Sequence, residues 1–214
     1  MPGAAAKQEA NRRHFDRWAR RYESDRVSRR LAVLQRSALE TLGLQPGDRL
    51  LDVGCGTGAA VRSAAAVAQR AVGVDLSAAM IARGRELATG LPNVELLEAD
   101  AEALPFAAGS FSAVLCTTSL HHYPHAERAV AEMARVLERG GRAVIADAVT
   151  DRPLVRLADR VLRLLQRGHV GLRSGGEIEA LLLGAGFARP RTRLLMNGVY
   201  AIVSATRPPV PASV

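Results

Sequence analysis

The 214-residue sequence lacks the features that define several large classes of protein. Its only cysteines, Cys55 and Cys116, lie far apart and outside any C-x-x-C arrangement, so we expect neither a disulfide nor a metal site. No apolar run approaches the roughly 18 residues of a membrane span, and residues 1–13 contain no apolar segment of a secretory signal. We therefore expect a reduced, cytoplasmic protein with no membrane span.

Lysine and aromatic residues are also scarce, although the chain is basic. The formal net charge is +8, Lys7 is the only lysine, and aromatic residues make up 4% of the chain. A basic chain is a candidate for binding nucleic acid. However, the chain has few aromatic side chains on which nucleic-acid bases could stack. Nucleic-acid binding is therefore the weaker expectation, and the choice between a monomer and a homodimer stays open.

A glycine-rich turn at Leu50–Gly58, LLDVGCGTG, organises the chain. A short apolar run ends at Asp52, glycines follow at alternate positions, and an alanine-rich segment that favours helix comes next. This order predicts a buried strand, a tight turn and a helix. Glycines let a ligand approach the main chain closely, and free N–H groups at a helix start point toward it. The turn therefore predicts a site for a nucleotide-like ligand.

Short apolar segments alternate with helix-forming segments through the rest of the chain. We expect helices at Ala4–Ser24, Val27–Leu42, Ser77–Leu87, Pro124–Leu137, Leu154–Leu165 and Gly175–Leu183. We expect strands at Leu50–Asp52, Ala71–Asp75, Val94–Ala99, Phe111–Thr117, Arg142–Asp147, Arg191–Met196 and Val199–Ala205. The alternation predicts an α/β fold with a mostly parallel, doubly wound sheet. Asn197-Gly198 between the last two strands is typical of a hairpin, so we expect an antiparallel C-terminal hairpin.

Three carboxylates follow the first three expected strands. Asp52, Asp75 and Asp100 fall at strand ends, so we expect all three at one rim of the sheet. The glycines and Asp75 also fit a dinucleotide fingerprint, but Asp52 would face and repel a pyrophosphate. The same carboxylate suits an ammonium or a sulfonium. The three acids together indicate amine, ribose and adenine contacts for an adenosyl amino acid.

At the level of motifs, the sequence resembles the class I S-adenosylmethionine-dependent methyltransferases, in particular the small type similar to the ubiquinone/menaquinone methyltransferases. LDVGCGTG resembles the family's first motif, GVDLS its second, and EADAEALPF the adenine segment. The stretch from FSAVLCTTSLHHYP to RAVIAD resembles the region between its fourth and fifth strands. The resemblance implies a seven-stranded Rossmann-like sheet with an antiparallel last strand, and S-adenosyl-L-methionine as methyl donor.

The resemblance also assigns roles to individual residues. The glycines would approach the methionine portion, Asp75 would hold the ribose, and Asp52 with the carbonyl of Thr117 would organise the amino end. The full set of expected cofactor-binding residues is Tyr22, Asp52, Gly54, Gly56, Gly58, Asp75, Leu76, Asp100, Ala101 and Thr117.

His121 and His122 follow the fourth expected strand, at the rim toward which the reactive methyl should point. A histidine is a suitable base for a phenol, a carbon acid or an amine. We expect His122 to be the catalytic base, the alternative being that one or both histidines only orient the loop.

Three regions of the chain complete the expected domain organisation. Residues 1–206 form one methyltransferase domain, with a helical lid at 1–45, a helical region on the acceptor side at 151–188, and a tail at 207–214. Within the second helical region, Arg156, Arg160, Arg163 and Arg167 share a helix, where they either recognise an anionic acceptor or form a solvated face.

The expected function is methyl transfer to an O, N or C nucleophile of a small molecule. Motifs for amino-group methylation of bases and for a cytosine C5 nucleophile are absent after the fourth strand, where TTSLHHYP stands. The alternatives are an RNA methyltransferase and a non-catalytic adenosylmethionine-binding protein.

Overall fold

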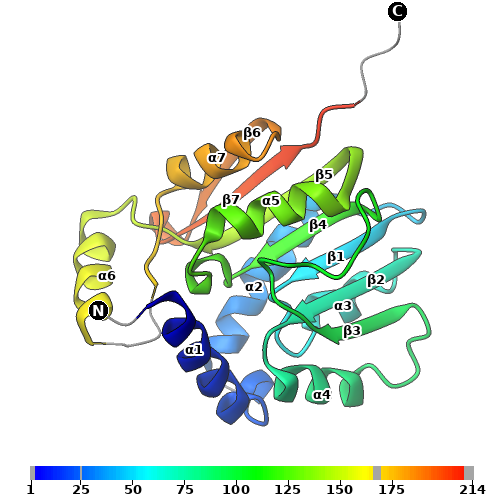
Figure 1. Ribbon diagram of the computed structural model, residues 1–214, viewed down its shortest axis with the longest axis horizontal. Helices are drawn as coiled ribbons and strands as arrows, with labels where there is room; N and C mark the ends of the chain where they lie inside the picture. Colours follow the sequence, from blue (N-terminus) through cyan, green and yellow to red (C-terminus); the bar gives the residue numbers. More distant parts are fainter. Residues whose placement is uncertain (1–2, 25, 166–169, 210–214) are drawn as a thin grey trace, which may run out of the picture.

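A mixed β-sheet with helices on both faces forms the framework of the protein (Figure 1). The computed structural model describes residues 3–24, 26–165 and 170–209. The strands are β1 (Arg49–Val53), β2 (Arg70–Asp75), β3 (Val94–Glu98), β4 (Phe111–Thr117), β5 (Leu137–Ala148), β6 (Ala188–Leu195) and β7 (Tyr200–Thr206). The helices are α1 (Ala4–Trp18), α2 (Arg26–Leu42), α3 (Ala59–Ala64), α4 (Ala78–Leu87), α5 (Ala126–Val136), α6 (Pro153–Leu165) and α7 (Gly175–Gly184).

The strand order is β3-β2-β1-β4-β5-β7-β6. Strands β1 to β5 pair in parallel, whereas β7 is antiparallel to both β5 and β6. The expected seven-stranded α/β fold with a C-terminal hairpin is therefore confirmed. The order reverses between β1 and β4, and ligands of doubly wound sheets bind beyond the strand ends at such a switch point.

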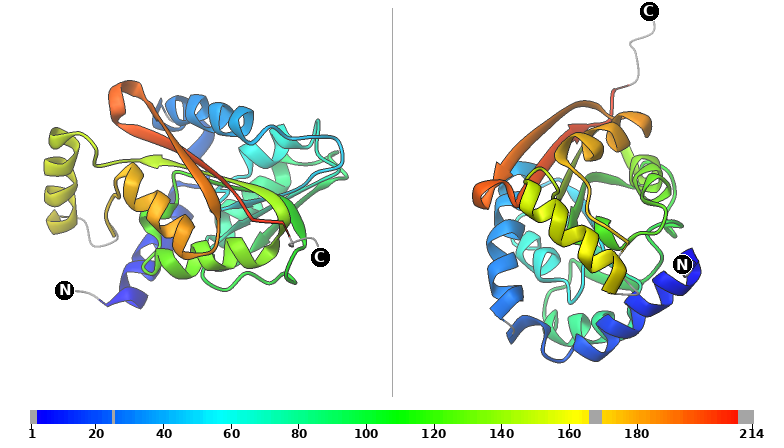
Figure 2. Two further views of the ribbon diagram at one scale, coloured as in Figure 1. Left: turned by 90° about the horizontal axis from the view of Figure 1, so that it is seen from above. Right: turned by 90° about the vertical axis from the view of Figure 1, so that its left-hand side faces the viewer.

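Two apolar layers hold the helices to the sheet, one on each face. One layer joins α2, α3 and α4 to the sheet and is centred on side chains such as Leu34, Val61 and Ile81. The other joins α5 and α7 and includes Met133 and Ile178. Figure 2 (left) shows the two groups of helices on opposite sides of the strands. Burial on both faces explains why β4 is buried along its whole length.

Several element boundaries differ from those expected. The first helix ends at Trp18, and a short 3₁₀ turn, η1, covers Tyr22–Ser24. Strand β5 starts at Leu137 instead of the expected Arg142, and it carries a bulge opposite Phe111 and Ala113. The hairpin connection has four residues, Met196 to Val199, of which η3 (Met196–Gly198) forms the first three, instead of the expected two.

Helices α1 and α6 lie at the edge where the parallel strands end (Figures 1 and 2). Of the expected tail, residues 210–214 lie outside the described residues. Among the helices that the structure describes, none has the length and apolar character needed to cross a bilayer.

Candidate active site

A cavity opens beyond the ends of β1 to β4. Its lining includes eight of the expected site residues: Tyr22, Gly54, Gly56, Asp75, Leu76, Asp100, Ala101 and Thr117. His122 lines the same cavity. The structure thus brings together residues that are spread over a hundred positions of the sequence. We call the ends of β1 to β3, with Gly54, Gly56, Asp75 and Asp100, the glycine rim.

Close packing fixes the glycine turn at Gly54. Gly54 has φ +75°, and a Cβ there would lie 2.5 Å from the Ser119 side chain and 2.6 Å from the Tyr123 hydroxyl. Ser119 Oγ and Tyr123 Oη both donate to the carbonyl of Val53, at 3.0 and 3.1 Å. A side chain at residue 54 would therefore push apart β1 and the loop after β4.

Asp75 is held by two backbone donors at the end of β2. One carboxylate oxygen accepts from Gly56 N–H at 2.9 Å, and the other accepts from Ser77 N–H at 2.9 Å. Burial raises the pKa of Asp75, although both hydrogen bonds act in the opposite direction. The carboxylate thus lies at the cavity wall in a fixed orientation, with lone pairs left for a ligand.

Asp52 differs from the other two acids of the glycine rim. It does not line the cavity: its side chain is fully buried, and neither carboxylate oxygen has a hydrogen-bond partner among the described residues. Burial, and to a lesser degree the charge of Asp75, raises the pKa of Asp52 to about 8. Asp52 therefore lies near the end of β1, behind the residues that line the cavity, and its contact with a ligand stays a prediction. A buried carboxyl group without partners is nevertheless a favourable place for a cationic ligand group.

Gly58 is the second expected residue outside the cavity lining. It precedes α3 with φ +75°, and a Cβ there would lie 2.9 Å from the Leu96 side chain. Gly58 therefore allows the turn to enter the helix and to pack on β3, instead of contacting the cavity.

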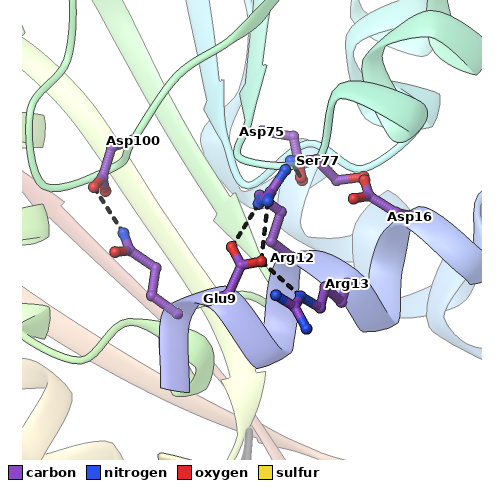
Figure 3. Close-up of polar contacts among 8 residues, drawn as sticks. Glu9, Arg12, Arg13, Asp16, Asp75, Ser77 and Asp100 are labelled. Carbon is purple, nitrogen blue, oxygen red and sulfur yellow. Dashed lines mark hydrogen bonds and ion pairs between the residues drawn. The ribbon is translucent and has the colours of Figure 1, made fainter. Parts of the chain in front are cut away.

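Helix α1 lies across the glycine rim (Figure 3). Gln8 Nε2 donates to Asp100 Oδ2 at 2.7 Å, and Ser77 Oγ donates to Asp16 Oδ1 at 2.6 Å. Gln8 and Phe15 also line the cavity. The N-terminal helix therefore covers the site from outside, and its opening as a lid stays a prediction.

A second cavity adjoins the first and shares Tyr22, Thr117 and Thr118 with it. The neighbour of Tyr22, Glu23, accepts from Thr57 Oγ1 at 2.7 Å, which ties η1 to the glycine turn. Burial and the charges of Asp75 and Asp52 raise the pKa of Tyr22 to about 12. Tyr22 therefore stays a neutral phenol that can donate a hydrogen bond where the two cavities meet.

The ends of β4 and β5 form a second rim, the histidine rim, with His121, His122, Tyr123 and Asp147. His122 faces the cavity, its ring edge-on to Phe15 at 5.0 Å between centroids, and its carbonyl accepts from Asn11 Nδ2 at 3.2 Å. The rings of His121 and His122 are 4.0 Å apart. Contacts from α1 and from the neighbouring ring thus fix the place of His122.

The His121 side chain contacts a buried carboxylate and does not line the cavity. Its Nδ1 lies 2.6 Å from Asp147 Oδ1, and its backbone N–H donates to Asp147 Oδ2 at 3.1 Å. Burial lowers the pKa of His121, but the charge of Asp147 and its hydrogen bond raise it more, so the net shift is upward. This pair favours the imidazolium form of His121.

Sequence reasoning missed Asp147, Ser119 and Tyr123. A signal for Asp147 was available, because RAVIAD is another apolar strand that ends in an aspartate. Ser119 and Tyr123 had no such signal, since their role depends on contact with β1, more than 60 residues away in the sequence.

The sheet order, the glycine turn and the acidic strand ends agree with the Rossmann-like fold expected from the sequence. The profile of a family described as "Methyltransferase domain" matches residues 51–145. This stretch of the chain is therefore similar to methyltransferase domains, and relatives named as methyltransferases match a larger part of the chain.

Several relatives carry the name demethylmenaquinone methyltransferase, and two of them illustrate the extent of the similarity. That of Beutenbergia cavernae is 37% identical over 139 residues, which cover 64% of this chain and 57% of the relative. The chain thus spans little more than half of that relative's length. That of Mycobacterium sp. (strain KMS) is 29% identical over 218 residues, covering 91% of this chain and 93% of the relative.

Among solved structures, a SAM-dependent methyltransferase from Thermotoga maritima has a similar fold. Its TM-score is 0.73 at 22% identity, covering 94% of this chain and 99% of that chain.

Proposed function

We propose that the protein transfers a methyl group from S-adenosyl-L-methionine to an O, N or C nucleophile of a small molecule. The observation that carries this proposal is the arrangement of the glycine rim. Asp75 and Asp100 present carboxylate oxygens to one cavity, and Asp52 lies buried without a partner behind it. This set of acceptors fits a cationic adenosyl group and opposes a pyrophosphate.

The residues of the two cavities fit the parts of the methyl donor. Asp75 would accept from the ribose hydroxyls, and Asp100 with Ala101 would contact adenine. Tyr22 and Thr117, which line both cavities, would contact the amino-acid portion, with Asp52 favouring its ammonium. Leu76 adds an apolar wall beside the base.

When bound, S-adenosyl-L-methionine would supply an electrophilic methyl carbon for in-line displacement. The protein has to align the acceptor atom and to take up its proton, and alignment alone can contribute roughly 7–11 kcal/mol. His122 faces the cavity and would take up the proton of the acceptor atom. His121, held by Asp147, would keep the neighbouring ring in place.

The names of the relatives support a small-molecule acceptor. Several of them are named demethylmenaquinone methyltransferase, including one that matches 91% of this chain. We infer that the acceptor belongs to a related class of activated ring carbons or phenols, for which a histidine base is suited.

Calorimetry with S-adenosylmethionine, S-adenosylhomocysteine and NADPH tests the donor. We expect binding of both adenosyl compounds and none of NADPH; tight NADPH binding alone would overturn the proposal. Turnover is then measured on phenols, quinols, amines and tRNA. Methylation of tRNA would favour an RNA methyltransferase, and donor binding without any turnover would favour a non-catalytic binding protein.

A further inference from the structure

Helix α6 turns its apolar side toward solvent. Leu154, Leu157 and Val161 are 78%, 58% and 45% exposed, and their spacing places them along one face of the helix. The opposite side contacts the protein through Asp159, which is 3% exposed and accepts from Leu172 N–H at 2.8 Å. An amphipathic helix normally packs its apolar face on the core. Here that face has no cover from the described residues.

Arg160 is exposed on α6 and borders this apolar face. Arg156 is exposed too, but it lies toward the side of Asp159, where its guanidinium donates to the carbonyl of Thr150 at 3.3 Å. Arg152 precedes the helix, and its Nε donates to the carbonyl of Asn197 at 2.6 Å. The helix's own acid, Asp159, is buried, and the carboxylate of Asp151 accepts from Gly175 N–H at 2.9 Å. The exposed charges described on α6 are therefore positive. Of the arginines expected to share this helix, the side chain of Arg163, and all of Arg167, lie outside the described residues.

The position of α6 leaves this face accessible to a large partner. The helix projects beyond the strand ends at the periphery of the molecule, next to the edge covered by α1 (Figures 1 and 2). It follows β5, whose end carries Asp147 of the histidine rim. A surface that met α6 would thus lie on the side of the site where His121 and His122 stand.

An exposed apolar stripe bordered by arginines is typical of helices that lie in a membrane interface. Leucine and valine side chains enter the headgroup region, while arginines extend to lipid phosphates. A flat anionic surface matches both the charge of this border and the net charge of +8.

We propose that α6 docks the protein on an anionic lipid surface, with Leu154, Leu157 and Val161 inserted and Arg160 on the phosphates. Binding itself does not depend on the proposed methyl transfer. If that transfer holds, the docked protein would present its histidine rim to acceptors dissolved in the bilayer.

Sedimentation of the full chain with lipid vesicles tests this proposal. We expect binding to vesicles of phosphatidylcholine mixed with phosphatidylglycerol, weakening as salt is raised, and little binding to phosphatidylcholine alone. The pair Leu154→Asp with Leu157→Asp should lower the partition coefficient about tenfold or more. Arg160→Glu should lower it several-fold on the mixed vesicles.

Matched controls separate docking from general effects of the substitutions. Leu183→Asp changes a leucine of α7 that is 54% exposed, and Arg128→Glu changes an exposed arginine of α5. Both should bind vesicles like the wild type, and thermal melting should show that every variant is folded. Calorimetry of S-adenosylmethionine on the α6 variants keeps a failure of docking distinct from a failure of the proposed function.

Three outcomes would overturn the proposal: no binding of the wild type to the mixed vesicles, equal loss in the Leu183 control, or a dimer in sedimentation velocity that Leu157→Asp dissociates while vesicle binding is absent. The last result would show that a second copy of the chain covers α6.

Discussion

The glycine rim and the histidine rim are built in different ways. In the glycine rim, Asp75 takes its hydrogen bonds from Gly56 and Ser77, both within 20 residues of it. In the histidine rim, His121 depends on Asp147, and His122 contacts Asn11 and Phe15 of α1, more than 100 residues away. The carboxylate of Asp75 is thus oriented by local strand-turn-helix geometry, whereas His122 is placed by contacts between elements distant in the sequence. We therefore expect substitutions in the two rims to affect different measurable quantities.

The largest expected effect is on donor binding, from Asp75→Asn. This change keeps an acceptor for one backbone N–H but removes the charge that strengthens hydrogen bonds to a ligand. Two charge-assisted hydrogen bonds at about 1.5–3 kcal/mol each predict a rise of about 10³-fold in Kd for S-adenosylmethionine. Calorimetry measures it, with Glu98→Gln, an exposed acid at the end of β3, as the matched control.

An unchanged Kd in Asp75→Asn, or an equal change in Glu98→Gln, would contradict the assignment of the ribose contact. A fall in melting temperature alone would assign Asp75 to holding the turn.

The next expected effect is on stability, from Asp52→Asn. Because the pKa of Asp52 is raised to about 8 in the folded protein, the folded state holds this proton more tightly than the unfolded chain. The free energy of unfolding therefore falls as pH rises from the unfolded pKa through the folded one. Asp52→Asn should thus stabilise the ligand-free protein by several kcal/mol above pH 8, and by almost nothing near pH 4.

Asp48 provides a control of opposite sign, four residues earlier. Burial raises its pKa, but hydrogen bonds from Gln45 N–H and Ser112 and the charge of Arg142 lower it more. Asp48→Asn should destabilise the protein at neutral pH, with the loss shrinking as pH falls through the pKa of the folded and unfolded states. Denaturant melts over this pH range measure both variants. If the free energy of unfolding changed with pH in the same way for Asp52→Asn and Asp48→Asn, the opposite pKa shifts of the two acids would be contradicted.

A smaller expected effect is on turnover, from His122→Ala. Loss of a general base predicts a fall of about 10² in kcat, with the Kd of S-adenosylmethionine nearly unchanged, since His122 belongs to the other rim. Steady-state kinetics with an acceptor found in the panel measures it, and His125→Ala, outside the cavity lining, is the matched control. Unchanged kcat at saturating donor would remove His122 from the mechanism.

The same contrast explains how far the sequence predicts the structure. The alternation of apolar and helical segments predicted all seven strands, because their register follows from local patterning and turns. It also predicted Asp75 and Asp100 at the cavity, since both follow directly from strand ends. The direction of the Asp52 side chain and the pairing of Asp147 with His121 depend on how strands lie against each other. No spacing in the sequence encodes those contacts.

The smallest expected effect lies where α1 joins the glycine rim. Gln8 Nε2 donates a hydrogen bond to Asp100 Oδ2 at 2.7 Å (Figure 3). The Asp100 carboxylate is the group expected to accept a hydrogen bond from adenine. S-adenosylmethionine would have to displace the Gln8 amide from Asp100. Gln8→Ala should therefore lower the Kd for S-adenosylmethionine about threefold, which corresponds to the free energy of one ordinary hydrogen bond. Asn11→Ala, which removes a contact to the His122 carbonyl, should leave that Kd unchanged. A higher Kd in Gln8→Ala would mean that Gln8 itself contacts S-adenosylmethionine. Helix α1 would then be part of the binding site instead of competing with the ligand for Asp100.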